Sequence, residues 1–281
     1  MPPDPTHRLS DSPTGRTKQR SPKAIGFVPN FVKHRSQEAE ELWQSVESHL
    51  PAVFTSLDAG TLAQSPEHYK TIADCVALHF ARSIESRRIH DNAVSAAKHH
   101  VFEDQDKLKQ LALAKHGLHL DAPAILGNIA TEVLADLNQT EASGELFQEW
   151  IEEVFHETRR YLAGSRVSVH HTDTDVEFLL GDCPAIGIGP NMHPMHRVPL
   201  YEATAILMPL GPKALAMLDR GASESPSDVP VQGEFAFYMN RAQVAQAHRQ
   251  VYYRPSSSFL AGLARAYRPP RKFRTSSNEP L

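Results

Sequence analysis

The sequence predicts an α+β protein, with a helical N-terminal half packed on a small antiparallel sheet and followed by a C-terminal helix. Three observations support this prediction. Apolar side chains recur at helical spacing through residues 24–164. Past Gly164 the apolar residues alternate as in strands, and a stripe within residues 232–254 again has helical spacing. Helices followed by strands are typical of an α+β domain.

The helical half contains several segments with recognisable start and stop signals. Ser36–Leu50 predicts a first helix, which Pro51 would end. Residues 66–89 predict a long core helix, and residues 91–109 an exposed helix or linker. Two more helices are expected, opening at Asp121–Pro123 and at Ser143, with Gly164 stopping the second.

Residues 165–220 predict antiparallel hairpins. Arg166–His170 and Val176–Leu180 flank a turn and predict one β-hairpin. Two further apolar runs, Ala203–Met208 and Ala214–Leu218, predict a second antiparallel pair. The last helix is expected over Asn240–Tyr253.

We expect one domain, residues 24–264, between two basic tails. Residues 1–23 carry five Lys or Arg against two Asp, and residues 265–281 carry five against one Glu. The first tail is predicted to be disordered and the second flexible, because neither can bury enough apolar surface to offset its ordering entropy. With a net charge of −4, the body carries about −11, so nucleic acid would bind only through the tails or a local groove.

Targeting and redox signals favour a cytoplasmic protein without a membrane partner. No apolar run approaches the roughly 20 residues that span a bilayer, and residues 1–21 lack the apolar stretch of a secretory signal. Only Cys75 and Cys183 are present, which indicates neither a disulfide framework nor a cysteine-based zinc site.

An apolar run ends at a lone carboxylate, Asp182, in the turn before Pro184. One interpretation is a metal ligand or general base that points into a cleft. The other is structural, since Asp before a turn commonly accepts hydrogen bonds from nearby backbone N–H groups.

Five short segments, in order, resemble a mostly bacterial family known only as a domain of unknown function. The family shows a His-Tyr-Val-Pro-like segment, a Gln-x-x-Arg-Thr-Pro-like stretch, a Thr-Ser-Asp-Asn-Pro-like turn, a Pro-Leu-Ser-Pro element, and a late Asn before an aromatic segment. The corresponding segments here are Gly26–Phe31, His79–Ser83, Leu180–Pro184, Met208–Pro212, and Asn240 with Val251–Tyr253.

The resemblance implies family-pattern positions without any established chemistry: Pro29, Arg82, Asp182, Pro184, Pro209 and Asn240. Gly26 stands where the family usually has histidine, so this chain would be impaired if that histidine were catalytic.

Histidines near the predicted sheet suggest a metal site. Asp182 with two of His170, His193 and His196 would suit a divalent transition metal such as Zn²⁺, Mn²⁺ or Fe²⁺ as cofactor. The alternative is that these are ordinary surface histidines, and His170 and His171 face opposite sides of a strand.

A second cluster is expected on the helix over residues 66–89. His79, Arg82 and Glu85 are three residues apart, so Arg82 could bind an anionic group while His79 exchanges protons. Alternatively, Arg82 pairs with Glu85 or Asp182 and pins the helix to the sheet.

Two functions follow from these candidates. The first is binding of an unknown small molecule or protein partner in a cleft between helices and sheet, through Arg82, Asp182 and Asn240. The alternative is a metal-dependent hydrolase that acts on phosphodiesters or nucleic acid and uses Asp182 with His170, His193 or His196. If the chain is a catalyst, the candidate catalytic residues are Asp182, His79 and Arg82. The sequence does not decide whether the chain is an enzyme.

Overall fold

The structure is a computed structural model that describes residues 7–11, 17–20, 37–100, 103–117, 123–172, 175–191, 193–221, 229–248, 250–254 and 256–267. It confirms the α+β class, with a helical first half, a small antiparallel sheet and a C-terminal helix. The helices are α1 (Gln37–Glu47), α2 (Leu50–Asp58), α3 (Pro66–Ala81), α4 (Ile84–His100), α5 (Gln105–His116), α6 (Pro123–Ser143), α7 (Glu145–Leu162), α8 (Gly233–Gln246) and α9 (Ser258–Ala266).

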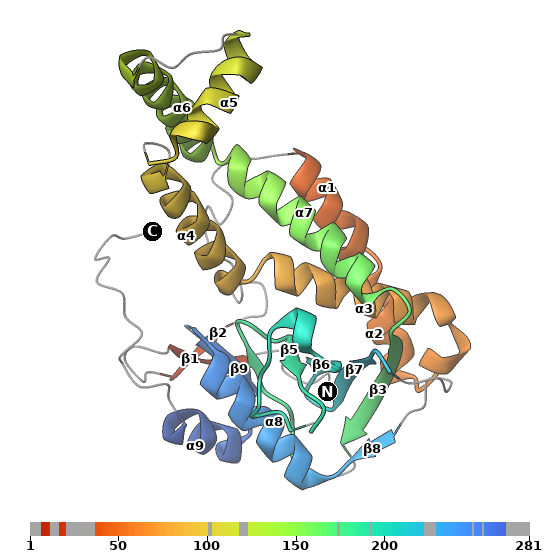
Figure 1. Ribbon diagram of the computed structural model, residues 1–281. Helices are drawn as coiled ribbons and strands as arrows, with labels where there is room; N and C mark the ends of the chain where they lie inside the picture. The colour runs from red at the N-terminus through yellow and green to blue at the C-terminus, as the bar shows by residue number, and fades with distance from the viewer. Residues whose placement is uncertain are drawn as a thin grey trace. The chain divides into compact units, whose positions relative to one another are not determined.

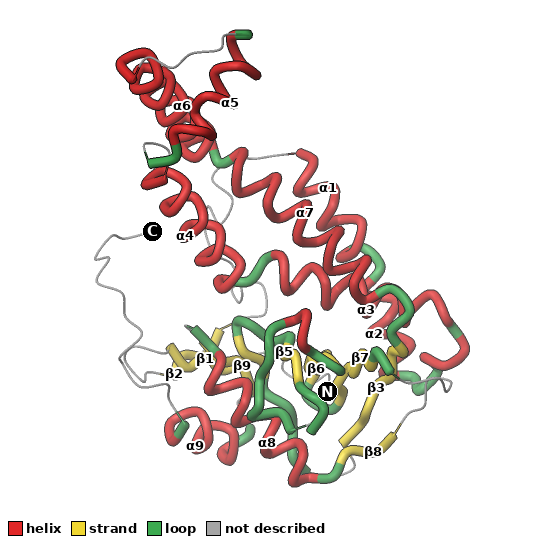
Figure 2. The backbone as a smooth tube through the Cα atoms, in the orientation of Figure 1, coloured by secondary structure: helices red, strands yellow, loops and turns green. Residues whose placement is uncertain are grey.

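The strands form two sheets (Figures 1 and 2). They are β1 (His7–Asp11), β2 (Thr17–Arg20), β3 (Arg166–Thr172), β4 (Leu180–Gly181), β5 (Ile186–Ile188), β6 (Ala205–Gly211), β7 (Ala214–Asp219), β8 (Val229–Val231) and β9 (Gln250–Tyr253). The first sheet has the order β2-β1-β9-β4 and is antiparallel throughout. The second has the order β5-β6-β7-β3-β8, in which only β3 and β8 run parallel.

The chain divides into two compact units. Unit 1 comprises residues 1–27, 46–80 and 158–281, and therefore holds both sheets together with α8 and α9. Unit 2 comprises residues 28–45 and 81–157, and its described residues are mainly those of α4, α5, α6 and most of α7.

Helix α8 lies at the centre of the core of unit 1. Its residues Ala236, Met239 and Ala242 pack with apolar side chains of the second sheet and with Phe178. Near its C-terminal end, Val244 and Ala247 pack with Leu179, β9 and α9 in another cluster. Neighbouring side chains Phe178 and Leu179 thus enter different clusters, and α8 joins the two.

The second predicted strand pair is confirmed, but the first hairpin is wrong. Strands β6 and β7 pair antiparallel as expected, whereas β3 pairs with β7 and β8. Of the segment Val176–Leu180, only Leu180 is in a strand, and that strand pairs with β9. An apolar run marks a buried segment but does not identify its hydrogen-bonding partner. Here the Asn240 side chain of α8 binds two backbone groups of the segment, Phe178 N–H donates to the Pro212 carbonyl, and Leu180 pairs with β9.

The predicted final helix is also wrong in its second half. Helix α8 begins at Gly233 and ends at Gln246, and Gln250–Tyr253 forms strand β9. The apolar spacing of Val244, Ala247 and Val251 fits a helix. However, β-branched and aromatic residues at 251–253 favour a strand when other strands are available on both sides. Helix α9, capped by the Ser257 hydroxyl, which accepts from Leu260 N–H, was not predicted.

Helix boundaries differ from the prediction at two turns. The long helix expected over residues 66–89 breaks between α3 and α4, where Ser83 Oγ accepts a hydrogen bond from Ser86 N–H at 3.0 Å and so caps α4. Pro51 lies in the first turn of α2 rather than only ending α1, a position where its missing N–H costs nothing.

Strands β1 and β2 lie within residues 1–23, for which the composition predicts a disordered tail. Backbone pairing to β9 supplies hydrogen bonds that composition does not reveal. The rest of that segment and residues 268–281 lie outside the described residues. Among the described helices, none combines the length and apolarity that crossing a membrane would need.

Candidate functional site

Two buried amides of α8 bind the backbone of the strand-to-turn segment at residues 177–184. Asn240 is fully buried; its Oδ1 accepts from Leu179 N–H at 2.8 Å, and its Nδ2 donates to the Glu177 carbonyl at 2.8 Å. One turn later, Gln243 accepts from Gly181 N–H at 2.8 Å and donates to the Pro184 carbonyl at 2.7 Å. In these four bonds, side chains rather than a strand satisfy buried backbone groups.

Gly181 is required by this arrangement. A Cβ at this position would lie 3.0 Å from Gln243 Oε1 and 3.1 Å from the Gln243 carbonyl oxygen. The close approach of the turn to α8 explains why a glycine precedes the aspartate in this chain.

The Asp182 carboxylate also accepts hydrogen bonds from backbone groups, and these groups lie far from Asp182 along the chain. Its Oδ1 accepts from His248 N–H at 2.8 Å, and its Oδ2 accepts from Gln250 N–H at 3.2 Å. Asp182 N–H donates in turn to the Gln250 carbonyl at 3.1 Å. The carboxylate therefore holds the chain where it leaves α8 and enters β9. This geometry is that of a structural aspartate, with acceptors facing backbone donors.

The candidate metal ligands are not brought together as a set. His170 Nε2 contacts Ser168 Oγ at 2.9 Å on one face of β3. The rings of His193 and His196 lie 4.9 Å apart between centroids. Across the part of the chain that the structure describes, no three His, Cys, Asp or Glu side chains are grouped so that they could hold a metal ion. Cys75 and Cys183 are both buried and are not joined in a disulfide.

The helix cluster predicted around Arg82 is divided by the break between α3 and α4. His79 is exposed in the last turn of α3, while Arg82 follows that helix and Glu85 begins the next. Arg82 belongs to unit 2, where its guanidinium carbon lies 4.3 Å from the ring centroid of Trp43. Asp182 and Asn240 belong to unit 1, and Gly26–Phe31 lies outside the described residues.

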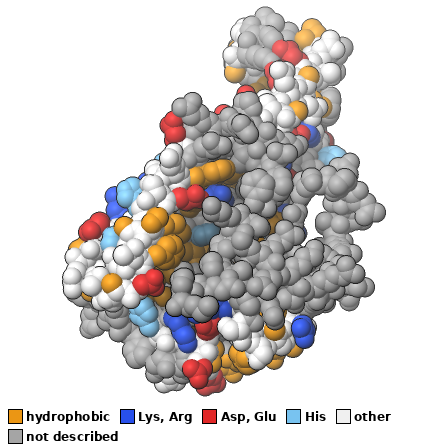
Figure 3. Space-filling model, turned by 180° about the vertical axis from the view of Figure 1, so that it is seen from behind, with side chains coloured by type: hydrophobic (Ala, Val, Ile, Leu, Met, Phe, Trp, Pro, Cys, Tyr) orange, Lys and Arg blue, Asp and Glu red, His pale blue; other side chains and the backbone are white. Residues whose placement is uncertain are grey.

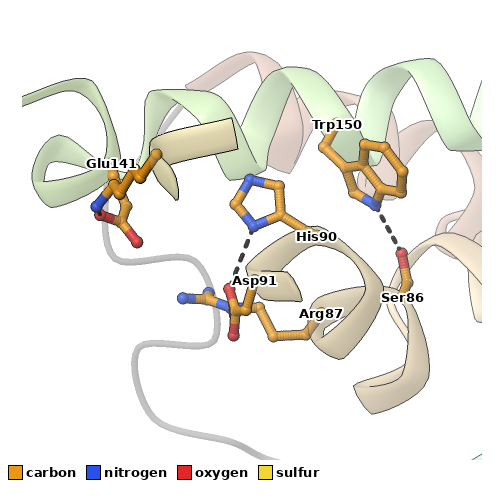
Figure 4. Close-up of polar contacts among 7 residues, drawn as sticks. Ser86, Arg87, His90, Asp91, Glu141 and Trp150 are labelled. Carbon is orange, nitrogen blue, oxygen red and sulfur yellow. Dashed lines mark hydrogen bonds and ion pairs between the residues drawn. The ribbon is translucent and has the colours of Figure 1, made fainter. Parts of the chain in front are cut away.

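Unit 2 has its own polar contacts between α4 and α7 (Figure 4). Trp150 Nε1–H donates to the buried Ser86 Oγ at 3.0 Å. One turn along α4, the buried His90 ring packs edge-on to Phe147, with centroids 5.1 Å apart, and contacts Asp91 at 3.2 Å. Lys98 of α4 forms an ion pair with Glu141 of α6. These contacts join helices and need no ligand.

A different group of side chains in unit 1 has chemistry that the fold does not use. The guanidinium carbon of Arg241 lies over the ring of Tyr267, 4.3 Å from its centroid. It lies farther from the ring centroids of Phe237 (5.8 Å) and Tyr238 (6.0 Å). The ring of His193 packs 4.9 Å from that of Tyr238. We call Phe237, Tyr238, Arg241, Tyr267 and His193 the Arg241 surface.

Arg241 makes neither a hydrogen bond nor an ion pair with any residue that the structure describes, and its Nε is buried without an acceptor. Aromatic faces stabilise a guanidinium but leave its N–H groups without acceptors. Such a group binds carboxylates or phosphates well, because two parallel N–H donors match two oxygens of the anion.

Sequence reasoning missed Arg241 because a lone arginine in a helix carries no motif. The available signal was its spacing, three residues after Tyr238 and four after Phe237, which places all three on one face of a helix. Tyr267 follows 26 residues later, after β9 and α9, so its contact could not be read from local spacing.

A family model described as "Protein of unknown function (DUF4238)" matches residues 8–257. This match confirms the expectation that the chain belongs to a family known only as a domain of unknown function. Neither the curated proteins nor the solved structures gave a match.

Proposed function

The chain belongs to the family of proteins of unknown function described as DUF4238, and we propose that it acts by binding an anionic ligand at the Arg241 surface. The observation that carries the proposal is the Arg241 guanidinium, which is held by aromatic rings while its buried Nε has no acceptor among the described residues.

Three features support binding at this place. Burial of a guanidinium edge without an acceptor costs free energy, which a bound anion would recover. The rings of Tyr267 and Tyr238 offer flat apolar surface beside the cation for an organic part of the ligand. The adjacent α8 side chains Asn240 and Gln243 fix the helix, so that the cation is held on a rigid element.

Two of the three residues favoured for binding from the sequence, Asp182 and Asn240, take supporting positions in this proposal, whereas Arg82 belongs to unit 2. Asp182 and Asn240 bind backbone groups on either side of the turn and hold α8 in place. The hydrolase hypothesis gains nothing from the geometry, since its aspartate and histidines are not grouped in the described part of the chain. We therefore favour ligand binding over hydrolysis.

Calorimetric titration with phenyl phosphate, benzoate and inorganic phosphate tests the proposal. Phenyl phosphate carries both an anion and a ring, and we expect it to bind more tightly than inorganic phosphate. Arg241→Gln should weaken phenyl phosphate binding roughly 10-fold to 100-fold, the range for a lost charge-assisted hydrogen bond. Arg241→Lys should bind phenyl phosphate more weakly than the wild type and more tightly than Arg241→Gln, because lysine keeps the charge but loses the paired donors.

Arg220→Gln is the matched control. Arg220 also stacks on a tyrosine, with its guanidinium carbon 3.8 Å from the Tyr161 centroid, but it hydrogen-bonds the hydroxyl of that tyrosine. Its replacement should leave anion binding unchanged. Equal affinities of the wild type and Arg241→Gln, or no binding of any of the three anions, would reject the proposal.

A further inference from the structure

A row of neighbouring rings connects α9, α8 and the loop that follows β5 in unit 1. In order, its members are Phe259, Phe237, Tyr238, His193 and His196. The centroids of consecutive rings lie 6.1, 5.8, 4.9 and 4.9 Å apart. We call these five rings the ring row. One planar group could cover only a part of it, so the row fits a ligand that carries several planar groups in succession.

The ring row is accessible at both ends and held in place between them. Phe259 is 49 % exposed, and His196 is exposed as well. The three rings between them are partly buried. The His193 ring is fixed by its own loop, since its Nδ1 accepts from Met195 N–H at 3.2 Å. Exposed aromatic faces of this kind are stabilised when a flat ligand covers them and removes them from water.

A cation lies beside the middle of the ring row. The guanidinium carbon of Arg241 is 5.8 Å from the Phe237 centroid and 6.0 Å from the Tyr238 centroid. Within α8, Glu234 is the one acidic residue and precedes these two rings by one turn. The anionic part of a ligand is therefore expected at Arg241 and not at the start of the helix.

Further cations follow in the chain directly after the Arg241 surface. Tyr267, on which Arg241 stacks, is the last described residue. Residues 268–274 follow it with four basic residues and no acidic one: Arg268, Arg271, Lys272 and Arg274. Seven residues span at most about 25 Å, so the covalent connection keeps these charges within that distance of Tyr267. Such a group of like charges attracts a ligand with several anionic groups.

Charge elsewhere in the molecule does not favour such a ligand. Residues 24–264 carry a net charge of about −11. On the face that Figure 3 shows, the described Lys and Arg side chains are interspersed with Asp and Glu. Binding of a polyanion is therefore expected to be local to Arg241 and the ring row.

We propose that the ring row binds single-stranded nucleic acid, with unpaired bases stacked on the rings and a phosphate at Arg241. This inference rests on the proposed function, because it places the anion of the ligand at the same guanidinium. Aromatic rings that accept bases, next to cations that accept the backbone, are the two features that single-strand binding surfaces combine. A duplex fits the row poorly because its bases are already paired and stacked, and an acidic peptide would use the cation but not the rings.

Fluorescence anisotropy of the full chain with labelled single strands tests the proposal. The probes are oligothymidine and oligouridine of about 12 nucleotides, within the usual span of such sites. The wild type should bind both at least about 10-fold more tightly than a duplex of the same length or thymidine monophosphate. It should also prefer them to an acidic peptide of equal charge.

Changes at Phe259 test the stacking. Phe259→Leu keeps an apolar side chain beside Phe237 but removes the ring, and should weaken single-strand binding about 10-fold. Phe259→Tyr keeps the ring and should bind as the wild type does. The matched control is Phe54→Leu, which replaces a phenylalanine of α2 that is 39 % exposed and is not part of the ring row. It should leave binding unchanged.

The two proposals fail in different ways. Phe259→Leu should leave phenyl phosphate binding unchanged, because Phe259 joins the row through Phe237, whereas Arg241→Gln should weaken both ligands. If phenyl phosphate binds, three results would overturn this inference alone. These are failure to bind either single strand, equal affinity for the duplex, the nucleotide or the peptide, and equal effects of Phe259→Leu and Phe54→Leu. Single-strand binding that Arg241→Gln leaves unchanged would reject both proposals.

Discussion

At the scale of single residues, side chains of α8 hydrogen-bond the backbone of the segment at residues 177–184. Asn240 and Gln243 are buried polar side chains whose amides each bind one N–H and one C=O of the segment at residues 177–184. Asp182 binds two N–H groups of the chain just after α8. The family-pattern residues Asp182 and Asn240 thus have a structural role, the hydrogen bonding of backbone groups, that needs no ligand.

Replacing Asn240 tests this role. Asn240→Ala leaves Leu179 N–H and the Glu177 carbonyl buried without partners, so the local free energy of opening should fall by about 2–4 kcal/mol. Hydrogen exchange of the Leu179 amide measures that free energy directly.

The control for this change is Gln232→Ala, which removes an exposed amide that precedes the same helix and makes no capping hydrogen bond. It should change the opening free energy at Leu179 by less than about 0.5 kcal/mol, as surface substitutions usually do. A similarly small effect for Asn240→Ala would contradict the assignment.

At the scale of elements, helices in unit 2 are joined by a few specific polar contacts. The Trp150 indole N–H donates to Ser86 Oγ and joins α7 to α4. His90 packs against Phe147 and Trp150 one turn further along. Such contacts fix how the helices are paired, since apolar packing alone tolerates several arrangements.

A double-mutant cycle measures the α4–α7 contact. Ser86→Ala should destabilise unit 2 by about 1–2 kcal/mol, because the buried indole N–H loses its acceptor. In the Trp150→Phe background the same change should cost less, giving a coupling energy of about 0.5–1.5 kcal/mol. Urea unfolding followed by the fluorescence of Trp43, which lies in unit 2 and is kept in all four variants, reports the result. A coupling energy near zero would show that the hydrogen bond does not stabilise the pair.

At the scale of the whole molecule, distant parts of the chain meet in one sheet. Strand β9 pairs with β1 on one side and with β4 on the other. These strands come from residues 7–11, 180–181 and 250–253. Most of the pairing partners of β9 are therefore supplied by the first 20 residues.

Removing residues 1–20 should expose one edge of β9. The amides of β9 that pair with β1 would then exchange with solvent much faster, because their acceptors are lost. Hydrogen exchange by mass spectrometry on a peptide covering residues 250–254 measures this change. Strand β6, in the other sheet, is the internal control. Unchanged exchange in β9 would mean that β1 does not protect it.

The sequence by itself determined the fold class, most helices, the β6–β7 pair and the family. These features follow from local periodicity and from short motifs in order, which need no knowledge of distant contacts. It also identified Asp182 and Asn240 as special positions. One interpretation of Asp182 was hydrogen bonding to nearby backbone N–H groups, but the carboxylate accepts instead from the distant N–H groups of His248 and Gln250.

Only the tertiary structure decided which groups meet. The sequence of Val176–Leu180 predicts a strand, but Asn240 binds the backbone of Glu177 and Leu179. The sequence of residues 250–253 predicts a helix, but these residues form a strand that pairs with β1 and β4. Arg241 and Tyr267 are ordinary in sequence and become neighbours through the packing of α9 on α8. The physical reason is the same in each case. Hydrogen bonds and ring contacts between residues far apart in the chain depend on which surfaces the helices and strands bury against one another, and local patterns do not contain that information.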